Sequence, residues 1–179
     1  MMYQIMVLVK RLKKEKNTKM SIWTHVNGNI RLDEFDYRNV EIIKFILGKM
    51  NTYDPGLSGL PIEDFSNNDK DILLPCGSEG SLKYNVLSNK DLNSLEAHSI
   101  SIWGDLRDYD DKDVIEKLIP WFSNLLNCFI KNRLFIRNAC LEVETEYRLH
   151  LVLVADCDNI NVEDKTIPIK VVAIDKADN

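Results

Sequence analysis

The stretch Ser21-Ile22-Trp23-Thr24-His25-Val26-Asn27-Gly28-Asn29-Ile30-Arg31-Leu32 alternates between two kinds of side chain. One parity is mainly apolar and carries Ile22, Thr24, Val26, Ile30 and Leu32. The other carries Trp23, His25, Asn27, Asn29 and Arg31. A period of two predicts a strand with one buried face, which Asn27-Gly28-Asn29 would bend or turn into a hairpin.

Residues 98–106 repeat this pattern, with Ile100, Ile102 and Leu106 on one side and Trp103 and Asp105 on the other. Residues 81–87, 135–145, 147–155 and 167–174 are predicted as further strands.

Two segments have apolar residues at helical spacing. Residues 36–50, capped by Asp33 or Asp36, form the first, and residues 113–131, capped by Asp110 or Asp111, form the second. Pro120 is expected to kink or split the second helix. Residues 51–75 are predicted to be a long functional or mobile loop.

The order of these elements predicts an α+β fold of the ferredoxin-like, split βαβ type (β-α-β-β-α-β). We expect a mostly antiparallel sheet with two helices on one face and extra C-terminal strands. Residues 20–179 would form this single α+β domain, and residues 1–19 a basic N-terminal extension.

Charge is spread unevenly along the chain. The extension contains six basic residues and one acidic residue, Glu15, whereas the whole chain has a formal charge of −5. The basic residues are Lys10, Arg11, Lys13, Lys14, Lys16 and Lys19. The remaining domain is therefore acidic, which disfavours non-specific binding of nucleic acids. The apolar run 5–9 is too short to cross a membrane and precedes its basic cluster, the reverse of a secretory signal. Four cysteines without a Cys-x-x-Cys pair favour a cytoplasmic location.

In the predicted fold the strands 21–32 and 98–106 lie side by side at the centre of the sheet. Trp23, His25, Trp103 and Asp105 would then share the face that the helices leave uncovered. Two indoles there can stack a nucleobase or anchor a partner protein. The alternative is that the C-terminal strands or a second copy of the chain in a homo-oligomer cover this face, making both tryptophans core residues.

Gly77-Ser78-Glu79-Gly80-Ser81 is a glycine-rich segment that leads into a strand. It lacks the lysine and the spacing of a phosphate-binding loop, so a tight turn is the favoured interpretation. Ser78, Glu79 and Ser81 remain candidates for hydrogen bonds to a ligand.

The segment 104–111 is rich in carboxylates. One interpretation is that Asp105, Asp108 or Asp110 holds Mg²⁺ for phosphoryl transfer. The favoured interpretation is that the aspartates before the helix cap it and that Arg107 forms an ion pair with Asp108. Arg107 also borders the proposed face and is a candidate for partner binding. Cys128, Cys140, His150 and Cys157 lack the paired spacing of zinc sites and are interpreted as packing residues. No catalytic residue, metal or cofactor is therefore assigned.

Three segments taken together resemble small accessory proteins, most of them uncharacterised, encoded by large tailed bacteriophages. They are 21–28 (SIWTHVNG), 77–82 (GSEGSL) and 104–109 (GDLRDY), and the resemblance spans about residues 20–155. It implies a protein made in the host cytoplasm that binds and disables a host factor, including components of host defence.

The leading hypothesis is a non-enzymatic binding protein, with no membrane contact, that takes a host protein or a small nucleotide ligand. One alternative is a module that binds RNA or single-stranded nucleic acid through the aromatic face. The other is a Mg²⁺-dependent phosphodiesterase or nuclease built on Asp105 and its neighbours.

Overall fold

The computed structural model describes residues 21–34, 46, 74–88, 96–146 and 149–173. Within them, six strands form one sheet in the order β2-β3-β1-β4-β5-β6, and all neighbouring strands are antiparallel. The strands are Trp23–Glu34 (β1), Lys83–Ser88 (β2), Glu96–Arg107 (β3), Phe135–Thr145 (β4), His150–Ala155 (β5) and Ile169–Ala173 (β6). As predicted, the two tryptophan-bearing strands β1 and β3 are direct neighbours.

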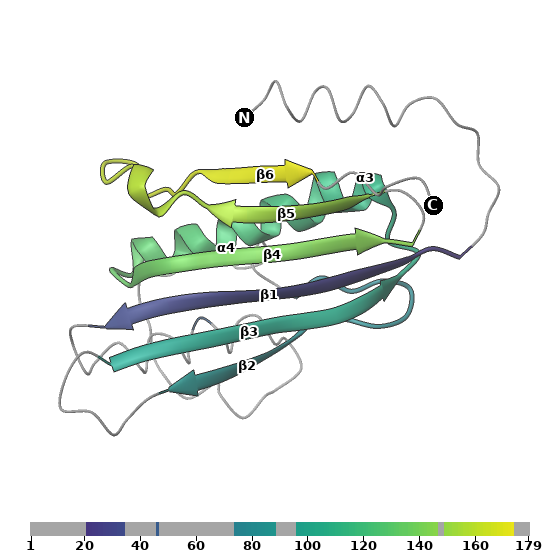
Figure 1. Ribbon diagram of the computed structural model, residues 1–179, viewed down its shortest axis with the longest axis horizontal. Coiled ribbons are helices and arrows are strands. Elements are labelled where there is room, and N and C mark those ends of the chain that lie inside the picture. Colours follow the sequence, from purple (N-terminus) through teal and green to yellow (C-terminus); the bar gives the residue numbers. More distant parts are fainter. Residues whose placement is uncertain (1–20, 35–45, 47–73, 89–95, 147–148, 174–179) are drawn as a thin grey trace.

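A long helix packs behind the sheet, on the side of β4 and β5 (Figure 1). It runs without a break through Asp111–Asp113 (α3), the π-helical turn Val114–Leu118 (η3) and Ile119–Lys131 (α4). The side chain of Asp110 caps this helix by accepting hydrogen bonds from the amides of Lys112 and Asp113. Asp110 is one of the two residues predicted as the cap. The π-helical turn ends two residues before Pro120, a residue that cannot donate a backbone hydrogen bond.

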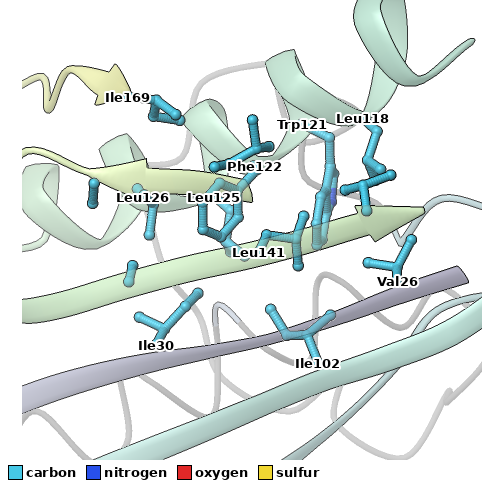
Figure 2. Packing of buried hydrophobic residues seen from close by; sticks show 14 of the residues in the cluster. Val26, Ile30, Ile102, Leu118, Trp121, Phe122, Leu125, Leu126, Leu141 and Ile169 are labelled. Atoms are coloured by element: carbon cyan, nitrogen blue, oxygen red, sulfur yellow. The ribbon is translucent and has the colours of Figure 1, made fainter. Parts of the chain in front are cut away.

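The hydrophobic core fills the space between this helix and the sheet (Figure 2). Phe122, Leu125 and Leu126 of α4 are fully buried, and so are Ile30, Ile102 and Leu141 of the central strands. Trp121, also on α4, is 4% exposed and belongs to the same core. The apolar parity of each strand therefore points towards the helix, and the polar parity points away from it.

The α+β class and the extra C-terminal strands are confirmed. β5 and β6 extend the sheet beyond β4 and do not fold over its open side (Figure 1). The predicted helix 36–50 lies outside the described residues except for Ile46, which is helical and fully buried. The extension 1–19 also lies outside them, as does nearly all of the loop 51–75.

Two details of the first strand differ from the expectation. β1 runs straight through Asn27-Gly28-Asn29 without forming a hairpin. A Cβ atom on Gly28 would lie 2.6 Å from the carbonyl oxygen of Cys140, so glycine here permits close approach of β4. Asp33 is part of β1 and is not a helix cap. It is 7% exposed and forms ion pairs with Arg31 (3.3 Å) and Arg137 (2.9 Å).

No helix in the described part of the chain combines the length and the apolar character needed to span a bilayer.

Candidate functional site

The three segments that carry the sequence resemblance meet at one end of the sheet. The glycine-rich segment forms a tight turn, in which the amide of Gly77 donates to the carbonyl of Gly80 (3.1 Å). This turn is hydrogen-bonded to the end of β3, because the amide of Ser78 donates to Arg107 and the amide of Arg107 donates to Glu79 (both 2.9 Å). Trp23 lies opposite Arg107 in the neighbouring strand.

Glycine is required in this turn for steric reasons. Gly80 has a positive φ of 76°, and a Cβ atom there would overlap the carbonyl oxygen of Asp105. A Cβ atom on Gly77 would overlap the backbone of Arg107 in the same way. The Gly-x-x-Gly spacing therefore reflects the close packing of two backbones, which side chains would prevent.

Polar side chains fix the same strand end, and we call Ser21, Ser78, Glu79, Arg107 and Asp108 the strand-end clamp. Asp108 has a left-handed φ of 57° and accepts hydrogen bonds from the hydroxyls of Ser78 (2.5 Å) and Ser21 (3.4 Å). Arg107 donates to Ser21 (2.7 Å) and forms an ion pair with Glu79, whereas the sequence favoured a pair with Asp108. Ser78 and Glu79 are thus engaged with the protein itself, and Ser81 forms a backbone bridge with Cys76.

The pKa of Asp108 lies below its usual range, chiefly because Ser78 donates a hydrogen bond to the carboxylate and also because Arg107 is nearby. A lowered folded-state pKa contributes stability that is present above the unfolded-state pKa and lost as pH falls through the folded-state value.

We therefore expect Asp108→Asn to lower stability at pH 7 but to have a smaller effect at pH 3. Asparagine is chosen because it tolerates the left-handed backbone conformation. Urea unfolding at both pH values measures the difference. Exposed Asp158→Asn is the matched control and should change stability little at either pH. An equal effect of Asp108→Asn at both pH values would contradict the assigned role of its charge.

The side of the sheet that faces away from α4 is termed the open face. Asp105, His25, Glu144 and His150 are direct cross-strand neighbours on β3, β1, β4 and β5, so acidic and basic side chains alternate across four strands. His25 Nδ1 lies 2.6 Å from Asp105 Oδ1, and both side chains are more than half exposed (52% and 61%). His150 Nε2 lies 2.7 Å from Glu142 Oε1, one position along the face.

The two tryptophans lie on either side of the His25–Asp105 pair. Trp103 is opposite Asn27 and is 42% exposed, whereas half-buried Trp23 is opposite Arg107. Their positions in the register differ by four residues, or ~13 Å along the strands. Both therefore belong to the open face as predicted, but they are too far apart to stack on the same base. The ring of Trp23 lies beside Gly80, 3.8 Å from the position of an added Cβ atom.

The aspartates that were considered for Mg²⁺ have other partners. Asp105 pairs with His25, Asp108 belongs to the strand-end clamp and Asp110 caps the helix. Asp111 accepts from Thr145 (2.8 Å), and Asp113 pairs with Lys117 (2.5 Å). In the described ranges, no group of three or more His, Cys, Asp and Glu side chains is arranged to hold a metal ion.

The cysteines are all free. Cys140 is exposed on the open face, opposite Asn29, so its interpretation as a packing residue is wrong. Cys128 and Cys157 are partly buried and pack against the core, and burial raises the pKa of the Cys157 thiol.

Glu142 and Glu144 complete the open face but were missing from the predicted site. The period of two in β4 places Cys140, Glu142 and Glu144 on one side of that strand. Their neighbours on β1 depend on the strand register, which has an irregularity between Arg31 and Leu32. The side-chain pattern was therefore visible in the sequence, whereas the row across four strands was not.

Neither a family model nor a curated protein sequence matches the chain. Among solved structures, one likeness is to the aminopeptidase PepT from Bacillus cereus, at 11% identity and a TM-score of 0.36, covering 70% of this chain but 29% of the aminopeptidase. Another is to a phage SAM lyase in complex with S-methyl-5'-thioadenosine, at 9% identity and a TM-score of 0.33, covering 90% and 95% of the two chains. At these levels the likenesses identify neither a family nor an activity.

Proposed function

We propose that the protein is a phage accessory protein that acts in the host cytoplasm by binding a host factor through the open face, without catalysing a reaction. The observation that carries this proposal is Trp103, which stands exposed beside the His25–Asp105 pair. The phage origin rests on the three sequence segments quoted above, and binding and inhibition of a host factor, including a defence component, follow from it.

An exposed indole on a sheet face is well suited to recognition. Tryptophan offers a large rigid surface with one polar donor, and it is enriched among the residues that dominate binding energy in interfaces. Around Trp103, the exposed side chains Lys83, Asn27 and Asp105 form a polar rim. An aromatic anchor with a polar surround is the usual anatomy of a protein interface.

A protein partner is favoured over the alternatives. The ~13 Å along the strands between the register positions of Trp23 and Trp103 argues against a base held between their indoles. The exposed carboxylates of Asp105 and Glu142 on the same face would repel an RNA backbone or the phosphates of a nucleotide.

We also propose that the domain has the ferredoxin-like split βαβ plan, completed by a second helix at 36–50. Two observations support it. β1 and β3 occupy the centre, with β2 and β4 on their outer sides, as this plan requires. Ile100 on β3 is fully buried, although α4 lies behind β4 and β5, so another element is needed to cover it (Figure 1). Ile46 is helical and fully buried, as a residue of such a covering helix would be.

The proposal predicts that Trp103→Ala reduces capture of the host factor at least tenfold, since loss of a central interface tryptophan costs about 2 kcal/mol or more. Immobilised full-length chain is incubated with host lysate, and bound proteins and small molecules are quantified by mass spectrometry. Val162→Ala serves as the control, because Val162 is also exposed (79%) but lies in a turn outside the sheet.

Unchanged capture by the Trp103 variant would show that the open face is not the binding site. Mg²⁺-dependent turnover of a nucleic acid or nucleotide that is lost in Asp105→Asn would overturn the proposal of a non-enzymatic protein.

A further inference from the structure

We infer that the open face recognises a cationic segment of a partner protein, one that presents arginine or lysine side chains. This inference rests on the proposed function and names the chemistry of the partner. It is carried by the way in which the carboxylates of the face are paired.

Several carboxylates elsewhere in the described residues pair with arginine or lysine side chains. Arg31 and Arg137 pair with Asp33, Arg107 with Glu79, Lys117 with Asp113 and Lys170 with Asp156. On the open face, by contrast, Asp105 pairs with His25, and Glu142 pairs with His150. Both carboxylates are exposed, Asp105 at 61% and Glu142 at 53%, so their oxygens are accessible to a partner at this face.

The exposed tryptophan provides a second element of recognition for the same chemical group. Trp103 and Asp105 are on the same side of β3 and two residues apart, or ~7 Å. A guanidinium group stacked on the indole gains a cation–π interaction and remains within reach of the Asp105 carboxylate. Asn27, a short side chain, lies between Trp103 and Glu142 in the cross-strand row. A second cation from the partner can therefore reach Glu142.

Other occupants of the face are disfavoured by the same charges. Nucleic acid would bring its phosphates against Asp105 and Glu142. A cationic partner gains from these charges, and its association should be accelerated at low salt.

The experiment measures binding of the full-length chain to three fluorescent probes: a short peptide of Arg-Gly-Ser repeats, a matched peptide of Glu-Gly-Ser repeats, and a single-stranded oligothymidylate. We expect the arginine peptide to bind preferentially and to weaken as salt is raised. The double variant Asp105→Asn/Glu142→Gln should weaken it about tenfold or more. Glu163→Gln, in an exposed turn away from the sheet face, is the matched control and should retain affinity within twofold.

Several outcomes would overturn the inference: no binding of the arginine peptide, stronger binding of either anionic probe, or equal binding by the double variant and the native chain. The basic segment 10–19 of the chain has the same chemistry as the proposed partner, so the experiment also tests it as the occupant. If neutralising it with Lys13→Gln, Lys14→Gln and Lys16→Gln strengthened arginine-peptide binding tenfold, the face would belong to that segment and not to a partner.

The lysate experiment separates this inference from the proposed function. Capture that is lost in Trp103→Ala but retained in Asp105→Asn/Glu142→Gln would leave the binding site correct and the cationic partner wrong. Capture retained in both variants would reject the site itself.

Discussion

Replacing Gly80 with alanine is expected to lower the free energy of unfolding by about 2–4 kcal/mol. Gly80 has a φ of 76°, and the new methyl group would overlap the carbonyl oxygen of Asp105. Relief of this overlap requires the turn to separate from β3, which breaks its hydrogen bonds to Arg107 and the Arg107–Glu79 ion pair. Chemical denaturation monitored by circular dichroism gives the change directly.

Ser81→Ala in the same turn is the matched control. Ser81 is exposed, and its replacement should change stability by no more than about 0.5 kcal/mol. A comparably small effect of Gly80→Ala would mean that the turn does not pack against β3 as described.

Replacing Ile46 with alanine is expected to cost about 2–5 kcal/mol of stability, because a fully buried isoleucine loses both its apolar contacts and the volume that it fills. Ile46 is the described residue of the predicted helix 36–50, so this substitution also tests the proposed second helix. Thermal and urea unfolding of the full-length chain measure the effect.

Val162→Ala provides the comparison, since Val162 is 79% exposed and should tolerate truncation with little change. If Ile46→Ala were equally neutral, residue 46 would not belong to the core, and the ferredoxin-like plan would lose its main support.

Much of the fold follows from local side-chain patterns. Alternation in 21–32 and 98–106 identified β1 and β3, because a strand with one buried face repeats every two residues. The pattern ending at Lys131 identified the long helix and gave Asp110 and Asp111 as candidate caps, of which Asp110 is the cap observed. Asp33 was misassigned because aspartate before an apolar run is a common helix cap. Its two arginine partners, one of them distant in sequence on β4, could not be recognised from a local signal.

The candidate site was predictable only in part, for the same reason. The parity of each strand placed Trp23, His25, Trp103 and Asp105 on one face. That Asp105 lies opposite His25, 80 residues away in the sequence, is set by the antiparallel register between β1 and β3. The contribution of Glu144 and His150 depends on further registers, including one with an irregularity. Pairing across strands is a property of the assembled sheet, and local periodicity does not encode it.

The row Asp105–His25–Glu144–His150 draws each of its members from a different strand. Short synthetic fragments of the chain cannot reproduce such a discontinuous epitope, since each would contain at most two of the four side chains and would lack the sheet that aligns them. Mapping with overlapping peptides will therefore miss the proposed contact surface. Chemical cross-linking or amide-exchange footprinting of the intact folded chain is the appropriate way to locate it.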